Sequence, residues 1–125
     1  MDALATQPVT ADLQAGLVMH TGTSRWFRHW GGQIIYTEGV RFLAMEAKAY
    51  WLIDLIASWC REQALRGEGF IVWKLLVNED RTALAIAEDG NGRELTRQNI
   101  HATDFPLDEI SLYLTDGTLL LPSEY

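Results

Sequence analysis

One acidic side chain, Asp54, lies within the otherwise apolar run YWLIDLIASWC, which spans residues 50–60. A charged carboxylate without partners in a dry core costs several kcal/mol, so Asp54 is expected to be solvated, paired or protonated. Three interpretations are open: a solvent-exposed helix residue, a buried partner of an arginine or tryptophan donor, or a catalytic acid or base. General acid–base catalysis needs a second positioned group, and none is evident in the sequence, which favours a structural role.

Helical spacing places Asp54 in a narrow polar stripe, because residues three and four positions apart share one helix face. The rest of the circumference is apolar. The nearest cations that could pair with Asp54 are Arg41, Lys48 and Arg61, and Arg28 or His29 could approach from the preceding segment. The predicted stripe consists of Ala47, Tyr50, Asp54, Ser58 and Arg61.

A second candidate site is the segment RWFRHW, residues 25–30, in which cations and aromatic rings are interleaved. This composition is typical of stacking and cation–π recognition, although the same tryptophans could pack in the core. In an extended chain, Trp26, Arg28 and Trp30 would share one face. The candidate binding residues are therefore Arg25, Trp26, Arg28, His29, Trp30 and Asp54.

Motifs for catalysis, metals or cofactors are absent from the sequence. The three histidines lack the HExxH spacing, and the single cysteine, Cys60, excludes a CxxC zinc site. Cys60 is expected to fill space in the core. The segment DGNG (residues 89–92) resembles the start of a calcium loop, but Arg93 follows where a ligand is required, so it predicts a turn. We predict no catalytic residue, no metal and no cofactor.

The composition predicts one globular domain. Of 125 residues, 48% are apolar and 22% are charged, as in folded proteins. A single cysteine favours a reducing compartment, the N-terminal segment lacks signal-peptide features, and no apolar run is long enough to span a bilayer. We expect a cytoplasmic protein that does not enter a membrane.

The net charge of −7 is unevenly distributed. Residues 25–66 contain six Lys or Arg and four Asp or Glu, whereas residues 67–125 contain four and eleven. Nucleic-acid binding depends on basic residues that neutralise phosphates, so direct binding to nucleic acid is not expected. The acidic half is compatible with a basic surface on a protein partner.

The periodicity of the sequence predicts an α+β fold. Residues 1–20 are interpreted as an N-terminal tail or short helix, with Thr10 as a possible cap, and residues 21–125 as a single α+β domain. One helix is expected to begin after Thr37, and a second to run from about residue 49 to 65.

The apolar period changes from 3.6 to 2 after Gly69, which predicts strands. They are expected near residues 70–77, 82–88 and 93–102, followed by a hairpin over 110–122 around Asp116 and Gly117. The predicted architecture is two or three helices on one face of an antiparallel sheet of about four or five strands.

Several segments together resemble a domain-of-unknown-function family of small uncharacterised bacterial proteins, often encoded on plasmids and phages. These segments are TGT, RHW, YTEGVRFLA and YWLIDLIAS, with DFPLDEISLYLTDGTLLLPSEY at residues 104–125. The resemblance covers about residues 20–125 and implies no activity, because the family has no established catalytic residue. It implies a context in which accessory proteins of mobile elements inhibit or redirect host proteins.

Two functional hypotheses follow. The first is a non-catalytic protein-binding accessory protein of a mobile genetic element, which inhibits a host defence or nucleic-acid enzyme. The second is a small hydrolase or nucleotide-binding enzyme that uses Asp54, His29 and nearby arginines. The sequence shows no nucleophile–base pair and no metal-ligand spacing, which favours the first hypothesis.

Overall fold

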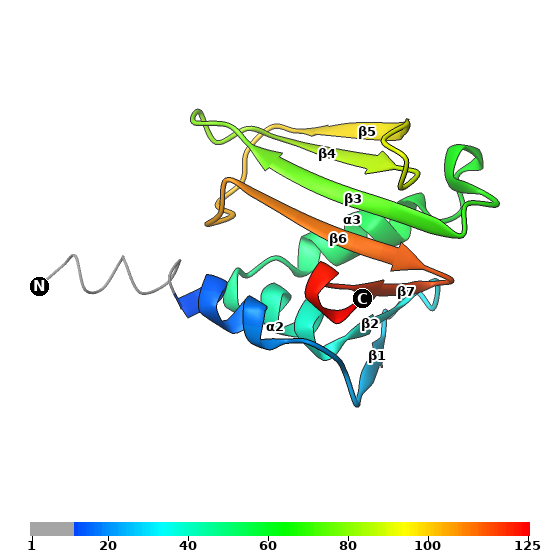
Figure 1. Ribbon diagram of the computed structural model, residues 1–125. Helices are drawn as coiled ribbons and strands as arrows, with labels where there is room; N and C mark the ends of the chain where they lie inside the picture. The colour runs from blue at the N-terminus through cyan, green and yellow to red at the C-terminus, as the bar shows by residue number, and fades with distance from the viewer. Residues whose placement is uncertain (1–11) are drawn as a thin grey trace, which may run out of the picture.

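Seven β-strands form one mixed sheet in the computed structural model, which describes residues 12–125 (Figure 1). The strand order is β1-β2-β7-β6-β3-β4-β5, so the last strand along the chain lies inside the sheet. All neighbours are antiparallel except β2 and β7, which are parallel. The strands are β1 (Trp26–Arg28), β2 (Ile35–Thr37), β3 (Phe70–Val77), β4 (Ala83–Glu88), β5 (Glu94–Ile100), β6 (Glu109–Thr115) and β7 (Thr118–Leu120).

The expected α+β class is confirmed, but the expected sheet is wrong in two respects. It has seven strands instead of four or five, and it is mixed instead of antiparallel. The strands β1, β2 and β7 have only three residues each, too few to show a clear alternation. The parallel pairing places Ile35 opposite Thr118, and no local pattern predicts so distant a contact.

The longer strands lie where the period of two predicts them. In β3, the side chains of Ile71, Trp73 and Leu75 are buried, and the residues between them are only partly buried. Between β6 and β7, Asp116 and Gly117 have φ angles of 50° and 80°. This left-handed pair is the conformation that an Asp-Gly hairpin turn requires.

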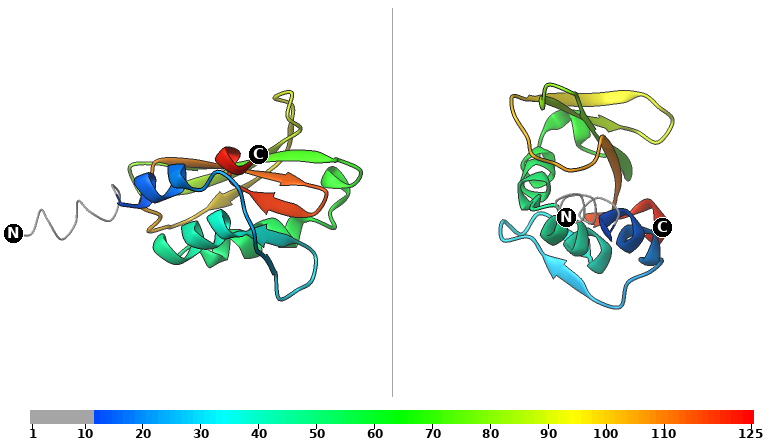
Figure 2. Two further views of the ribbon diagram at one scale, coloured as in Figure 1. Left: turned by 60° about the horizontal axis from the view of Figure 1, so that its bottom comes forward. Right: turned by 90° about the vertical axis from the view of Figure 1, so that its left-hand side faces the viewer.

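The helices α2 (Glu38–Glu46) and α3 (Tyr50–Trp59) lie on the same face of the sheet (Figure 2). The predicted cap of α2 is confirmed, because Thr37 Oγ1 accepts a hydrogen bond from the backbone N–H of Val40 at 3.2 Å. A third helix covers residues 12–19, and its Gly16 lies so close to the Phe42 ring of α2 that a Cβ would collide with it. The predicted cap Thr10 and tail lie outside the described residues.

The second predicted helix is shorter than expected. α3 ends at Trp59, and a separate 3₁₀ turn, η1 (Gln63–Leu65), follows it. Leu65 is nine positions after Ile56, about two and a half helical turns, so a continuous helix would place the two residues on opposite sides. Both are buried, at 4% and 0% exposure. The break after α3 therefore lets Leu65 turn back into the core.

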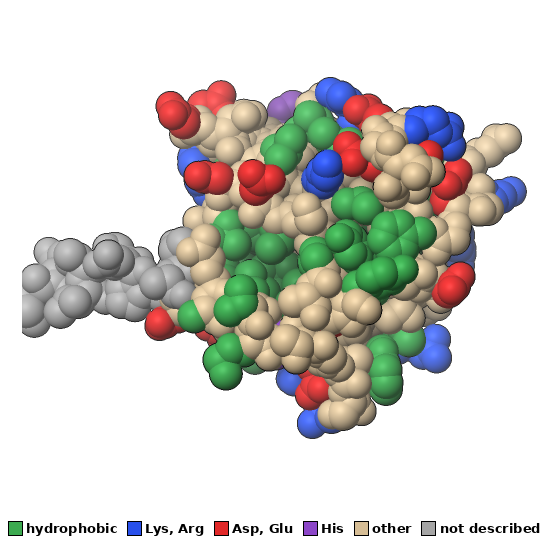
Figure 3. Space-filling view, in the orientation of Figure 1, with side chains coloured by type: hydrophobic (Ala, Val, Ile, Leu, Met, Phe, Trp, Pro, Cys, Tyr) green, Lys and Arg blue, Asp and Glu red, His purple; other side chains and the backbone are tan. Residues whose placement is uncertain are grey.

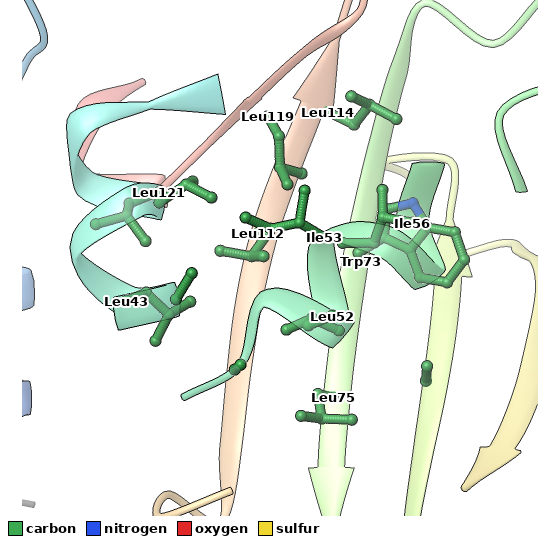
Figure 4. Packing of buried hydrophobic residues seen from close by; sticks show 14 of the residues in the cluster. Leu43, Leu52, Ile53, Ile56, Trp73, Leu75, Leu112, Leu114, Leu119 and Leu121 are labelled. Carbon is green, nitrogen blue, oxygen red and sulfur yellow. The ribbon is translucent and has the colours of Figure 1, made fainter. Parts of the chain in front are cut away.

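The core lies between α3 and the middle of the sheet. Leu52, Ile53 and Ile56 of α3 lie over the side chains of β3 and β6, including Trp73, which is 2% exposed (Figure 4). The predicted apolar side of α3 is thus the side that contacts the sheet. This packing fixes α3, and with it the position of Asp54 on the opposite side of the helix.

Candidate functional site

His29 and Asp54, which are 25 positions apart, come together between the end of β1 and α3. His29 Nε2 lies 2.8 Å from Asp54 Oδ1. The indole N–H of Trp30 donates to the same oxygen at 3.2 Å. One carboxylate oxygen therefore holds two consecutive aromatic side chains against the helix.

Both ring nitrogens of His29 have partners. The backbone N–H of Gly31 donates to Nδ1 at 3.1 Å, so the neutral ring carries its proton on Nε2 and donates it to Asp54. The His29 side chain is 6% exposed, whereas that of Asp54 is 53% exposed. In this arrangement His29 links the turn to α3 and offers no free nitrogen to a substrate.

The polar stripe on α3 is exposed, as its spacing predicted. Tyr50, Asp54, Ser58 and Arg61 all face solvent, whereas Ala47 precedes the helix and is 4% exposed. Asp54 is thus both solvated and hydrogen-bonded. Among the described residues, His29 and Trp30 donate hydrogen bonds to Asp54, and the cations Arg41, Lys48 and Arg61 do not pair with it.

Two tryptophans of the RWFRHW segment are exposed. Trp26 is 54% exposed and Trp30 is 87% exposed, and both arginines of the segment also face solvent. We call the group Arg25, Trp26, Arg28 and Trp30 the β1 surface. It lies on and beside an edge strand of the sheet.

The alternation along β1 separates its side chains into two groups. Trp26 and Arg28 share one face, and Phe27 is on the other, where its ring stacks on Tyr36 with centroids 5.8 Å apart. Trp30 lies beyond the strand, in the following turn. Its direction is therefore set by Asp54 and by the His29 ring, 5.2 Å away, and not by strand parity.

An arginine of α2 contacts the same strand. Arg41 Cζ lies 4.7 Å from the centre of the Phe27 ring, and Arg25 Cζ lies 5.5 Å from it, within the range of cation–π attraction. Burial raises the pKa of Tyr36 beside this ring; Tyr50 and Asp54 also raise it, and Arg41 opposes them. Sequence reasoning named Arg41 only as a possible partner of Asp54 and did not place Phe27 at the site, although the alternation in RWFRHW marks Phe27 as the inward residue.

Cys60 is half-buried at the end of α3, consistent with the expected core position. Its Sγ lies 3.4 Å from the Ile56 carbonyl oxygen, and burial raises the pKa of its thiol. Within residues 12–125, no three His, Cys, Asp or Glu side chains are grouped as a metal site requires. No helix in this part of the chain is both long and apolar enough to cross a membrane.

A family model described as a family of unknown function, DUF6876, matches residues 11–125. The chain belongs to this family. No curated protein and no solved structure matched the chain. The resemblance to a family of unknown function is therefore confirmed, and the match extends further toward the N-terminus than the sequence motifs, to include helix 12–19.

Two motifs of this DUF6876 chain, YTEG and LPSEY, meet at the beginning of α2. Glu124 Oε1 accepts hydrogen bonds from the Thr37 hydroxyl at 2.6 Å and from the Leu121 backbone N–H at 2.9 Å. Glu124 Oε2 accepts one from the backbone N–H of Gly39 at 3.2 Å. A carboxylate is favourable at the positive end of a helix, so these motif residues stabilise the fold.

The face of the sheet opposite α2 and α3 carries a second aromatic group that sequence reasoning missed. The rings of Phe70, Tyr113 and Tyr125 lie with centroids 5.1 to 5.5 Å apart, and Tyr125 is 75% exposed. Figure 3 shows apolar side chains gathered on this face. Tyr113 is directly opposite Val72 across the β3–β6 ladder, a pairing that the sequence alone does not show.

Proposed function

We propose that this protein is a non-catalytic binding protein that contacts a protein partner through the β1 surface. The family context expected from the sequence motifs is part of the proposal. It makes the protein a cytoplasmic accessory product of a mobile genetic element and its partner a host protein, such as a defence or nucleic-acid enzyme. The proposal assigns no reaction to the site.

The exposure of Trp30 is the observation that carries this proposal. A tryptophan that is 87% exposed leaves a large apolar surface in water. This ring is nevertheless held in place, because its N–H is bonded to Asp54 and its face lies against His29. An aromatic ring that is fixed before binding loses little conformational entropy on binding, which suits it to be an interface anchor.

The arginines beside the tryptophans support the same proposal. Tryptophan and arginine are the residue types most enriched at positions that dominate the free energy of protein–protein binding. Arg28 is exposed, and no ion pair of its guanidinium occurs among the described residues. Its hydrogen-bond donors are therefore available to a partner.

The hydrolase alternative has less support from the geometry. Its two central groups, His29 and Asp54, are adjacent, but each ring nitrogen of His29 already has a partner within the protein. A general base needs a free nitrogen or oxygen within hydrogen-bond reach of the proton that it removes. We therefore base the proposal on binding.

The experiment is capture from a bacterial host lysate with the purified protein as bait, followed by mass spectrometry and by affinity measurement with the captured partner. Trp30→Ala and Arg28→Ala should each weaken the affinity by more than about 1 kcal/mol. Matched controls are Arg61→Ala, an exposed arginine in the turn that follows α3, and Val18→Ala, an apolar residue that is 71% exposed.

Circular dichroism and urea unfolding must show that each variant is folded. The controls should bind the partner as tightly as the wild-type protein. A folded Arg28→Ala protein and a folded Trp30→Ala protein that both retain wild-type affinity would contradict the proposal.

A further inference from the structure

A small cavity lies next to the β1 surface, between the end of helix 12–19, the segment that leads into β1, and α2. Its volume is about 210 Å³. Charged groups of both signs gather at the lower edge of the molecule, below α2 and beside β1 (Figure 3). The cavity is lined by His20, Arg25, Glu38, Arg41, Phe42 and Met45.

The two arginines of this cavity are positioned but not paired. Both guanidiniums lie on the ring of Phe27, which restricts their movement. Among the described residues, neither side chain forms an ion pair, whereas Arg93 and Arg97 both contact carboxylates. A guanidinium carries five N–H donors in a planar fork that matches an oxyanion. The cavity therefore presents arginine N–H donors that have no carboxylate partner within the described part of the chain.

Glu38 is the single carboxylate in the lining, and it is held by other partners. Its Oε1 accepts from the Ser24 backbone N–H at 3.0 Å and lies 3.3 Å from the hydroxyls of Ser24 and Thr23. Glu38 offsets only one of the two arginine charges, so the lining is cationic although the chain has a net charge of −7.

The size of the cavity indicates what it can hold. Pockets for drug-sized molecules have volumes of about 300 Å³ or more, so this cavity fits a single side chain better than a larger organic ligand. Phe42 and Met45 give it an apolar wall on which the methylene groups of a glutamate could pack, and Met45 is 50% exposed.

We infer that this cavity binds a carboxylate side chain from an acidic segment of the partner, with Arg25 and Arg41 as the anion-binding residues. The inference rests on the proposed function, because Arg25 belongs to the β1 surface and joins the cavity to it. It also reverses what the net charge suggests: the partner surface that meets this site is acidic and not basic.

His20 adds one hydrogen-bond acceptor to the wall of the cavity, because a neutral ring that donates from Nδ1 carries no proton on Nε2. Its Nδ1 lies 2.9 Å from the Gly16 carbonyl oxygen and donates to it, and its ring lies against Phe42 with centroids 5.1 Å apart. The ring is therefore fixed in the wall of the cavity. Its Nε2 has no hydrogen-bond partner within the described part of the chain.

The test is an NMR titration of the full-length, ¹⁵N-labelled protein with a short peptide of alternating glutamate and glycine. The same peptide with glutamine in place of glutamate is the control ligand, and inorganic phosphate and acetate are separate probes. The glutamate peptide should shift the signals of α2 and of the arginine side-chain N–H groups and bind more weakly in high salt. The glutamine peptide should cause no such shifts.

Arg41→Gln should weaken binding of the glutamate peptide by about tenfold, because it removes a charge-assisted hydrogen bond. Arg41→Lys, which keeps the charge but loses the fork, should weaken it less. Arg61→Gln should have no effect. Three results would each overturn the inference. The two peptides could bind equally well, or folded Arg41→Gln could bind the glutamate peptide with undiminished affinity. Phosphate or acetate could also cause shifts when the glutamate peptide causes none.

Arg41 is outside the β1 surface, so the two proposals can fail separately. If Arg41→Gln binds the captured partner as the wild type does and Trp30→Ala does not, the inference is overturned and the proposed function stands. If Trp30→Ala and Arg28→Ala both bind the partner normally, the proposed function fails, and the peptide titration still decides whether the cavity binds carboxylates.

Discussion

The Thr37 hydroxyl donates a 2.6 Å hydrogen bond to Glu124 Oε1, across 87 positions of the chain. The same carboxylate accepts from two backbone N–H groups, so it satisfies donors at the first turn of α2 and in the C-terminal segment. Thr37 in turn caps α2. The contact therefore joins the start of a helix to the segment that follows the last strand.

Glu124→Ala should destabilise the protein by about 2 kcal/mol, because it leaves partly buried donors without an acceptor and removes a negative charge from the helix terminus. Gly39→Ala should have a similar effect, since a Cβ there would lie 2.7 Å from the Glu124 carboxylate and from a Leu121 methyl group. Urea unfolding measures both changes. Glu109→Ala, at an exposed glutamate, is the control, and a loss as large in that variant would argue against a specific role of Glu124.

Replacing Asp54 by asparagine should change the stability of the protein little, whereas replacing it by alanine should destabilise the protein. In Asp54→Asn, one oxygen remains to accept from His29 and Trp30, so we expect a loss of stability of less than about 1 kcal/mol. Asp54→Ala leaves the buried N–H of His29 without a partner and should cost about 1 to 3 kcal/mol. Urea unfolding gives the stability, and the indole N–H signal of Trp30 in the ¹⁵N-labelled protein follows the ring. Equal stability of the two variants would contradict this account.

The Cys60 thiol should react slowly while the protein is folded. Burial raises the pKa of this thiol, so less of it is in the reactive thiolate form at a pH of about 8 than for a free cysteine. The rate of reaction with a thiol reagent, measured with and without denaturant, tests this expectation. A folded protein that reacts as fast as the denatured one would contradict it.

Glu38 should contribute to stability in a pH-dependent way. The Ser24 backbone N–H, then the hydroxyls of Thr23 and Ser24 and the charge of Arg25, hold the pKa of Glu38 below its ordinary value of 4.5, against a smaller opposing effect of burial. Because this pKa is lower in the folded state, Glu38 stabilises the fold at pH values above 4.5. That stabilisation is lost as the pH falls through the pKa of the folded state. The urea midpoints of wild type and Glu38→Gln should therefore differ at a pH of about 6 and converge in acid. A difference that does not depend on pH would refute this assignment, and Glu79→Gln is a control at an exposed position.

The sequence predicted the parts of the fold that depend on local patterns. A run of eight residues rich in branched and aromatic side chains predicted β3, the Asp-Gly pair predicted the β6–β7 turn, and Thr37 predicted the start of α2. The β2–β7 pairing was not predictable, because three-residue strands carry little alternation and their contact is distant in sequence.

The candidate site was predictable in composition but not in arrangement. Trp30 and Trp73 are the same residue type, yet one is 87% exposed and the other 2%. Strand alternation predicts burial for Trp73, which lies in β3. Trp30 is placed by a bond to Asp54, 24 positions away, which no spacing rule reveals.

The interior position of β7 has a consequence for synthesis on the ribosome. β1 and β2 join the rest of the sheet through β7, which leaves the ribosome about 80 residues later than they do. Until then the nascent chain has no partner for the free edge of β2, and the carboxylate that binds the start of α2 has not yet been made. Translation that stalls before residue 118 should therefore release an incomplete sheet with exposed apolar surface, a substrate for chaperones and proteases.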